Sequence, residues 1–228
     1  MLIRIADVLS AEQVVAARQQ LDTTDWADGK VTAGHQSGQV KRNLQLPQDH
    51  PLAVSLGELI TAQLECHPTF ISAALPSRIY PPLFNRYDTG MDFGNHVDNA
   101  IRLDPLTGRY LRTDLSATLF LSEPDEYDGG ELVMDEAGGP QAIKLAAGDM
   151  ILYPATTVHH IRPVTRGQRV AAFFWIQSMI RDQAQRELLF NLDLSVQQLG
   201  SSSEADITAS KVRLTGTYHN LLRMWAEV

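Results

Sequence analysis

The sequence has a single cysteine, Cys66, in 228 residues. One cysteine cannot form an internal disulfide, and it cannot supply a cysteine-based zinc or iron–sulfur site. Disulfides are rare in the reducing cytoplasm, so we expect a cytoplasmic protein. No apolar run approaches the roughly 18 residues of a membrane span, and Arg4 and Asp7 interrupt the place where a signal peptide would be apolar. The sequence therefore predicts neither a secreted nor a membrane-bound protein.

Positive charge is also scarce. Lysine and arginine number 19 against 27 aspartate and glutamate residues, which gives a formal net charge of −8. Phosphate backbones repel such a chain, so we expect no nucleic-acid partner. The 44% of hydrophobic residues is ordinary for a globular protein, and 228 residues suffice for one substantial domain with an appendage.

The first region, residues 1–72, has the pattern of a mixed α/β segment packed on a core. Leu2 to Ile5 predict a short strand. Ser10 and Gln13 form a capping box, which predicts a helix that runs to about Leu21. A second helix is predicted from Leu52 to about Leu64.

The second region, residues 73–180, is rich in short strands. In "RTDLSATLFLS" the residues alternate, with one set of side chains on each face of the strand. One face carries Leu115, Ala117, Leu119 and Leu121, and the other carries Ser116, Thr118 and Phe120. The segments "DGGEL", "AGDMILYP" and "RVAAFFWIQS" add turns and further strands. This pattern predicts a mainly β fold whose core is an antiparallel sandwich or a jelly roll.

The third region, residues 181–228, predicts a helical hairpin. Its two helical segments are joined by a serine-rich patch from Gly200 to Glu204. The hairpin packs either on the β core, as a stabilising cap, or on a second subunit, which would make the protein a homo-oligomer. A third reading makes the hairpin itself the functional part, as a scaffold.

The stretch "MDFGNHVDNAIR" places His96 two residues before Asp98. In a strand these two side chains point to the same face and converge on one ion. Such a triplet is common by chance, so a third ligand on another strand must support it, and His159 and His160 are the candidates. Two histidines and one carboxylate form the facial triad of non-haem iron oxygenases.

A facial triad leaves three positions open, of which 2-oxoglutarate fills two and dioxygen the third. The far carboxylate of 2-oxoglutarate then needs a fixed cation, and Arg169 is the candidate. A two-residue turn at Arg166 and Gly167 would put His160 on the face of Arg169, whereas a three-residue turn from Thr165 to Gly167 selects His159. A glycine in the last turn position favours the second arrangement only mildly.

The order of these motifs resembles a known family. Tyr87, His96-Val97-Asp98, "DGGEL", "GDMILYP" and the run from His159 to Arg169 are similar to the Fe(II)- and 2-oxoglutarate-dependent dioxygenases of the prolyl 4-hydroxylase-like superfamily, and especially to the bacterial PKHD-type hydroxylases. The similarity spans nearly the whole chain, including "LFNRY" and the helical tail. The resemblance implies a mainly β fold with a double-stranded β-helix (jelly roll) core, N-terminal helices and a C-terminal helical hairpin. It implies that His96, Asp98 and His159 bind iron. It also implies that Arg169 anchors 2-oxoglutarate and that Tyr87 contacts it.

The resemblance also implies a reaction. A C–H bond of an unidentified small-molecule or peptidyl substrate is hydroxylated by dioxygen, while 2-oxoglutarate is converted to succinate and CO2. L-ascorbate is the expected reductant of stray Fe(III). The carboxylate of Asp98 occupies the position that halogenating relatives leave open for chloride, which favours hydroxylation. The alternative is a cupin-like metal-binding module or isomerase without oxygen chemistry, which would keep His96, Asp98 and His159 but would not need Arg169.

Two segments are candidates for a lid or for gripping the substrate. The stretch from Trp26 to Gln48 is polar, and the loop from Ile101 to Arg112 follows the His96-Asp98 motif directly.

Overall fold

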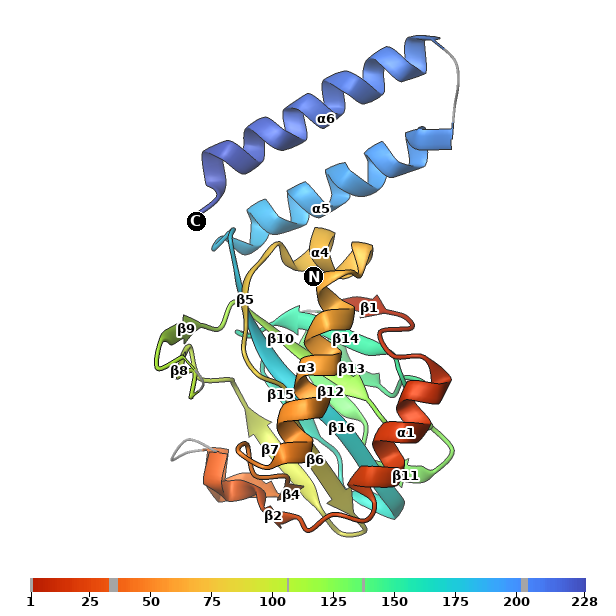
Figure 1. Cartoon of the computed structure of the whole chain (residues 1–228), viewed down its shortest axis with the longest axis vertical. Helices are drawn as coiled ribbons and strands as arrows, with labels where there is room; N and C mark the ends of the chain where they lie inside the picture. The colour runs from red at the N-terminus through yellow and green to blue at the C-terminus, as the bar shows by residue number, and fades with distance from the viewer. Residues whose placement is uncertain (1, 33–36, 106, 137, 202–204) are drawn as a thin grey trace.

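The chain folds into helices and two antiparallel sheets arranged in layers. The computed structural model describes residues 2–32, 37–105, 107–136, 138–201 and 205–228. Helices α1 (Ala11–Leu21) and α3 (Pro51–Glu65) cover one face of a large sheet, as Figure 1 shows, and a smaller sheet packs against its other face. This arrangement confirms the jelly-roll prediction.

Strand order follows the jelly-roll pattern, and every pairing is antiparallel. Within the described residues, the large sheet runs β1-β14-β10-β16-β6-β4-β2, with β11 and β5 also paired to β16. Its strands are β1 (Ile3–Ile5), β14 (Met150–Pro154), β10 (Leu115–Phe120), β16 (Val164–Ser178), β6 (Leu83–Asp88), β4 (Leu44–Gln45), β2 (Ala27–Asp28), β11 (Tyr127–Gly129) and β5 (Pro76–Ile79). The small sheet runs β13 (Gly139–Ile143), β12 (Leu132–Glu136), β15 (His159–Ile161), β7 (Asp92–His96) and β3 (Lys41–Arg42). Strands β8 (Ile101–Leu103) and β9 (Tyr110–Arg112) form a separate hairpin.

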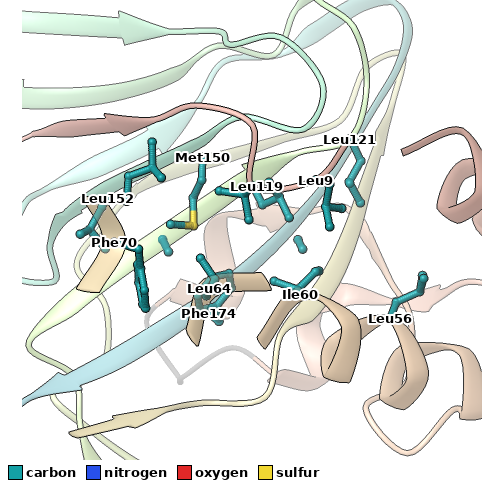
Figure 2. Close-up of a cluster of buried hydrophobic side chains, with 14 of the residues drawn as sticks. Leu9, Leu56, Ile60, Leu64, Phe70, Leu119, Leu121, Met150, Leu152 and Phe174 are labelled. Atoms are coloured by element: carbon teal, nitrogen blue, oxygen red, sulfur yellow. The ribbon is translucent and has the colours of Figure 1, made fainter. Parts of the chain in front are cut away.

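The main core lies between the helices and the large sheet. Figure 2 shows Leu119, Met150 and Leu152 of the strands together with Ile60 and Leu64 of α3. The predicted alternation in β10 is confirmed, because its leucines and Ala117 join this core while Phe120 joins a second core between the two sheets. Strand β10 is buried on both faces, which explains why its polar side chains are also hidden.

The N-terminal helices begin where the sequence predicts. Ser10 caps α1, since its hydroxyl accepts a hydrogen bond from the Gln13 backbone and the Gln13 side chain accepts one from the Ser10 backbone. Pro51 is the first residue of α3, where its missing N–H costs nothing. A further helix, α4 (Pro68–Ala74), was not predicted. The polar stretch from Trp26 to Gln48 contains β2, a 3-10 turn (Gly29–Thr32), α2 (Ser37–Val40), β3 and β4, and residues 33–36 lie outside the described part.

The predicted turn within Thr165 to Gly167 is wrong. Residues 164–178 form the single strand β16, and the chain passes from the small sheet to the large sheet at Arg162 and Pro163. Gly167 does have a positive φ of 73°, but it lies opposite Tyr127, where a Cβ would overlap the carbonyl oxygen of Glu126. The glycine therefore permits close strand contact rather than a hairpin.

The C-terminal helical hairpin is confirmed. Helices α5 (Gln183–Gln198) and α6 (Ala205–Trp225) are joined through a 3-10 turn (Leu199–Ser201), and α5 packs on α4 (Figure 1). Residues 202–204 of the serine-rich patch lie outside the described part. The buried Arg186 side chain fixes the start of α5, because its Nη1 donates to the carbonyl oxygens of Ile180 (2.7 Å) and Arg181 (2.8 Å). Among the described residues, no helix combines the length and apolarity needed to cross a bilayer.

Candidate metal centre and co-substrate pocket

Two paired strands of the small sheet bring three side chains together. His96 ends β7, Asp98 follows it by two residues, and His159 begins β15 directly opposite His96. One ligand atom from each residue lies within 4.8 Å of the others, and His159 Nε2 is 3.9 Å from Asp98 Oδ2. The three residues that the sequence singles out as iron ligands therefore form one cluster.

Backbone carbonyls fix the tautomer of both histidines. Nδ1 of His96 is 2.8 Å from the carbonyl oxygen of Gly94, and Nδ1 of His159 is 2.9 Å from that of Thr157. A carbonyl only accepts hydrogen bonds, so each Nδ1 carries the proton and donates it. Each Nε2 then keeps its lone pair, which is the arrangement of a metal-binding imidazole.

The carboxylate of Asp98 is oriented by a strand of the large sheet. The hydroxyl of Ser116 on β10 donates to Asp98 Oδ2 at 2.6 Å. Tyr153 on β14 approaches from the same sheet, with its hydroxyl 3.4 Å from His159 Nε2. Burial raises the pKa of Tyr153 well above its usual value, so this phenol stays neutral.

The electrostatics of the cluster favour neutral imidazole at His96. Burial, followed by the positive charge that His159 would carry, lowers the pKa of His96 to about 4. A neutral histidine has the free lone pair that a metal requires.

His160 takes no part in this cluster. It pairs with Val133 on β12 and belongs neither to the three-residue group nor to the pocket lining, and its Nδ1 is buried without a hydrogen-bond partner in the described chain. Alternate residues of a strand face opposite sides, which separates the two neighbouring histidines.

Arg169 and Tyr87 lie opposite each other on β16 and β6. Each side chain is only 1% exposed. The guanidinium carbon of Arg169 is 5.4 Å from the Tyr87 ring centroid and 5.3 Å from that of Phe120. Burial raises the pKa of Tyr87 to about 12, against the charge of Arg169, which lowers it.

The guanidinium of Arg169 is also without hydrogen bonds inside the described part of the protein. None of its three nitrogens has a hydrogen-bond partner among the described residues, although all three are buried. A buried, unpaired cation is costly in a protein, and a bidentate carboxylate is the partner that fits it best.

A single pocket joins the cluster to Arg169. Its volume is about 710 Å³ including its mouth. It is lined by Lys41, Asn85, Tyr87, Phe93, His96, Val97, Asp98, Asn99, Arg102, Ser116, Ala117, Thr118, Leu132, Tyr153, His159, Ile161, Arg169, Phe173, Phe174 and Trp175. All five site residues expected from the sequence are in this lining.

Several lining residues were not predicted. The alternation in β10 placed Ser116 and Thr118 away from the leucine face, which was the signal for a polar pocket wall. Tyr153 has the same kind of signal, as a polar tip within "MILYP". No pattern marked Lys41 or Arg102, which lie on short strands of segments treated only as possible lids.

Two family models match the chain. Residues 82–177 match the 2OG-Fe(II) oxygenase superfamily, and residues 183–227 match the PKHD-type hydroxylase C-terminal domain. A PKHD-type hydroxylase of Bordetella pertussis is 55% identical over 228 residues, with 100% of both chains covered. One of Xanthomonas axonopodis pv. citri is 56% identical over 230 residues, again with 100% of both covered.

The chain belongs to the PKHD-type hydroxylases. It is therefore a hydroxylase that depends on Fe(II) and 2-oxoglutarate, as the sequence motifs implied.

Solved structures share the fold of this PKHD-type hydroxylase. A Pseudomonas putida prolyl-4-hydroxylase has a TM-score of 0.51 at 18% identity, covering 78% of this chain and 92% of its own. A Trichoplax adhaerens prolyl hydroxylase, in complex with a hypoxia inducible factor peptide fragment, has a TM-score of 0.58 at 13% identity, covering 82% and 86%. At such identities the likeness establishes the jelly-roll fold.

Proposed function

We propose that His96, Asp98 and His159 hold the Fe(II) of this hydroxylase and that Arg169, with Tyr87, binds the far carboxylate of 2-oxoglutarate. The observation that carries the proposal is the buried guanidinium of Arg169. It lies in the same pocket as the His–Asp–His cluster, and its nitrogens have no hydrogen-bond partner within the described part of the chain.

The donor set suits Fe(II). Two neutral imidazole nitrogens and one carboxylate oxygen are the protein ligands of non-haem iron oxygenases, and together they leave open positions for a co-substrate. Ser116 holds one oxygen of Asp98 by a hydrogen bond, which orients the carboxylate.

The surrounding residues position the reactants. Arg169 fixes one end of 2-oxoglutarate, and the buried, neutral Tyr87 and Tyr153 line the same pocket. When bound, iron and 2-oxoglutarate activate dioxygen to hydroxylate an unactivated C–H bond, and 2-oxoglutarate is released as succinate and CO2. The alternative of a cupin-like module would leave the buried charge of Arg169 unexplained.

The decisive variant is Asp98→Ala. We expect succinate release to be lost while the fold is retained, because Asp98 supplies the sole carboxylate of the cluster. Succinate is measured after incubation with Fe(II), 2-oxoglutarate and clarified cell extract, and a +16 Da product is sought by mass spectrometry. Full succinate release by Asp98→Ala would contradict the ligand assignment.

We further propose that L-ascorbate sustains turnover by returning stray Fe(III) to Fe(II), and that the primary substrate is a small molecule or a peptidyl group. A cytoplasmic location is supported by the free, exposed Cys66 as the chain's one cysteine. Omission of ascorbate from the succinate assay should shorten the linear phase of the reaction.

The three-part division into residues 1–72, 73–180 and 181–228 also stays a proposal. It is supported by the end of β16 at Ser178 and the start of α5 at Gln183. We propose that the C-terminal helices mediate self-association, since Val212 and Met224 on α6 are 68% and 73% exposed. The mass of the full chain in solution, measured by light scattering, tests this.

A further inference from the structure

The pocket is positively charged although the chain is acidic. Its described lining has three cationic side chains, Lys41, Arg102 and Arg169, and one carboxylate, Asp98. The whole chain carries a formal charge of −8. Bound Fe(II) and doubly charged 2-oxoglutarate cancel each other, so the loaded pocket keeps an excess of two positive charges. A further anion would balance it.

The three cationic side chains lie beside two separate parts of strand β16. Arg169, Phe173 and Trp175 share one face of this strand, because their positions differ by even numbers. The guanidinium carbon of Arg102 lies 3.5 Å from the Trp175 ring centroid, and Nζ of Lys41 lies 5.6 Å from the Phe173 ring centroid.

Spacing along the strand separates Arg102 from Arg169. Trp175, which Arg102 contacts, is six residues from Arg169, about 20 Å along an extended strand. With the far carboxylate of 2-oxoglutarate on Arg169, Arg102 lies in a different part of the pocket, where a second anion can meet it.

The positive charges of Lys41 and Arg102 are destabilised by burial and by their mutual repulsion. Lys41 is only 4% exposed and donates to Gln45 Oε1 at 3.1 Å. Burial, followed by the charge of Arg102, lowers the pKa of Lys41 to about 8. The Nε of Arg102 is buried and has no hydrogen-bond partner among the described residues. Asp98 and Asp28 offset this effect on Lys41 in part. Two desolvated like charges still destabilise each other, and an anion near both would relieve the penalty.

The two cations also border apolar surface. Phe173 and Trp175 meet edge to face at 5.6 Å, and Phe93, which stacks on His96 at 3.6 Å, lies 5.5 Å from Lys41 Nζ. This aromatic wall connects the cations to the metal cluster, so a ligand bound here has an apolar body next to the place of reaction.

We propose that Lys41 and Arg102 form a second anion subsite, which binds a carboxylate of the primary substrate and places its apolar part against Phe173 and Trp175. This inference rests on the proposed function, in which Arg169 is occupied by 2-oxoglutarate. The carboxylate belongs either to a free small acid or to an acidic side chain of a peptide. Arg102 lies on the β8–β9 hairpin, so this hairpin would contact the bound substrate.

The test is binding, measured by calorimetry on the full-length enzyme loaded with Co(II) and saturating 2-oxoglutarate, which blocks Arg169. One arm compares 3-phenylpropanoate with its neutral amide. The other compares the blocked dipeptide acetyl-Phe-Asp-amide with acetyl-Phe-Asn-amide. We expect at least one carboxylate to bind about tenfold or more tightly than its neutral partner, as for a charge-assisted pair. The arm that responds identifies the source of the carboxylate.

Matched variants assign the effect to the two cations. Arg102→Met and Lys41→Met should each abolish the preference for the carboxylate, while Arg42→Met should keep it. Arg42 neighbours Lys41 on β3 but is exposed, and its guanidinium pairs with Asp92 at 2.6 Å. Equal affinity for the charged and neutral probes in both arms, no binding of any carboxylate, or an unchanged preference in both variants would overturn the inference.

A separate measurement keeps the two proposals distinguishable. The charge-transfer band of the anaerobic Fe(II) protein with 2-oxoglutarate should be present in the unmodified chain and unchanged in Arg102→Met. Loss of this band in the unmodified chain refutes the proposed function. Its presence, without discrimination between the probes, refutes the second subsite alone.

Discussion

At the scale of single residues, His159 and His160 differ in environment although they adjoin in the sequence. His159 is 4% exposed and lies beside Asp98, whereas His160 pairs with Val133 and does not line the pocket. The alternation of β15 alone produces this difference. The sequence favoured His159 partly through a hairpin turn at Thr165 to Gly167, which the structure does not contain. Two arguments for His159 remain: neighbouring residues of a strand face opposite sides, and the motif order resembles the family.

We predict that His159→Ala abolishes iron-dependent succinate release and that His160→Ala leaves most of it. His159 supplies one of three donor atoms, while His160 points away from them. Steady-state succinate release at saturating Fe(II) measures the effect, and circular dichroism controls for folding. The reverse pattern would mean that the cluster is assigned to the wrong face of β15.

We predict that Arg169→Ala raises the 2-oxoglutarate requirement at least a hundredfold and leaves Fe(II) binding nearly intact. Removal of one partner of a buried charge pair costs about 3–5 kcal/mol, which is roughly two to three and a half decades in affinity. Arg169→Lys should fall in between, because an ammonium keeps the charge but loses the parallel hydrogen bonds.

The measurement is a titration of 2-oxoglutarate into the anaerobic Fe(II) protein, followed by its charge-transfer band. Arg166→Ala is the matched control, since Arg166 lies on the same strand but is exposed and pairs with Asp128. An unchanged curve for Arg169→Ala would place the anchor elsewhere.

At the scale of elements, two glycines hold β11 close to the start of β16. Gly129 and Gly167 have φ values of 71° and 73°, and a Cβ on either would overlap a carbonyl oxygen of the facing segment, from Pro163 or from Glu126. Only glycine adopts this conformation without strain and leaves this space free. Both glycines therefore allow β11 to pack closely where the chain crosses from β15 to β16, the strand that carries Arg169.

We predict that Gly129→Ala and Gly167→Ala each lower the free energy of unfolding by at least about 1–3 kcal/mol, the usual cost of a strained backbone position. Gly216→Ala is the control, because Gly216 lies on α6 and an added Cβ would meet no other described part of the chain within 4 Å. That change should be neutral or stabilising by up to ~1 kcal/mol. Urea denaturation measures all three, and equal stability of the three variants would refute the role of Gly129 and Gly167.

At the scale of the whole molecule, the pocket links the two sheets. Arg169 and Ser116 belong to the large sheet, while His96 and His159 belong to the small sheet. A ligand that bridges the metal cluster and Arg169 binds only when both sheets are in place, so it stabilises the entire fold.

We predict that 2-oxoglutarate raises the melting temperature of the Co(II)-loaded protein. A ligand at a hundred times its dissociation constant contributes about 2.7 kcal/mol, which for a chain of this size is roughly 5–11 °C. Differential scanning fluorimetry measures the shift. In Arg169→Ala the rise in melting temperature caused by 2-oxoglutarate should be lost, while the rise caused by Co(II) should remain. An identical 2-oxoglutarate shift in the variant and the unmodified protein would contradict the role of Arg169 as anchor.

The sequence by itself determined those features that depend on neighbours along the chain. The capping box at Ser10, the alternation from Leu115 to Phe120 and the pairing of His96 with Asp98 all follow from the period of a helix or strand. These local rules indicated the β-rich core, the helical tail and the candidate ligands, and the order of the motifs indicated the family.

Only the tertiary structure decided which distant residues share the pocket. Lys41 meets Phe173, and Ser116 meets Asp98, because strand pairing and sheet packing bring together segments that no local period connects. The sequence also did not show that the chain crosses from the small sheet to the large sheet at Pro163. A positive φ at Gly167 is compatible with a close strand contact as well as with a turn. Periodicity fixes the face on which a side chain lies, but the partner across that face is set by the packing of the whole chain.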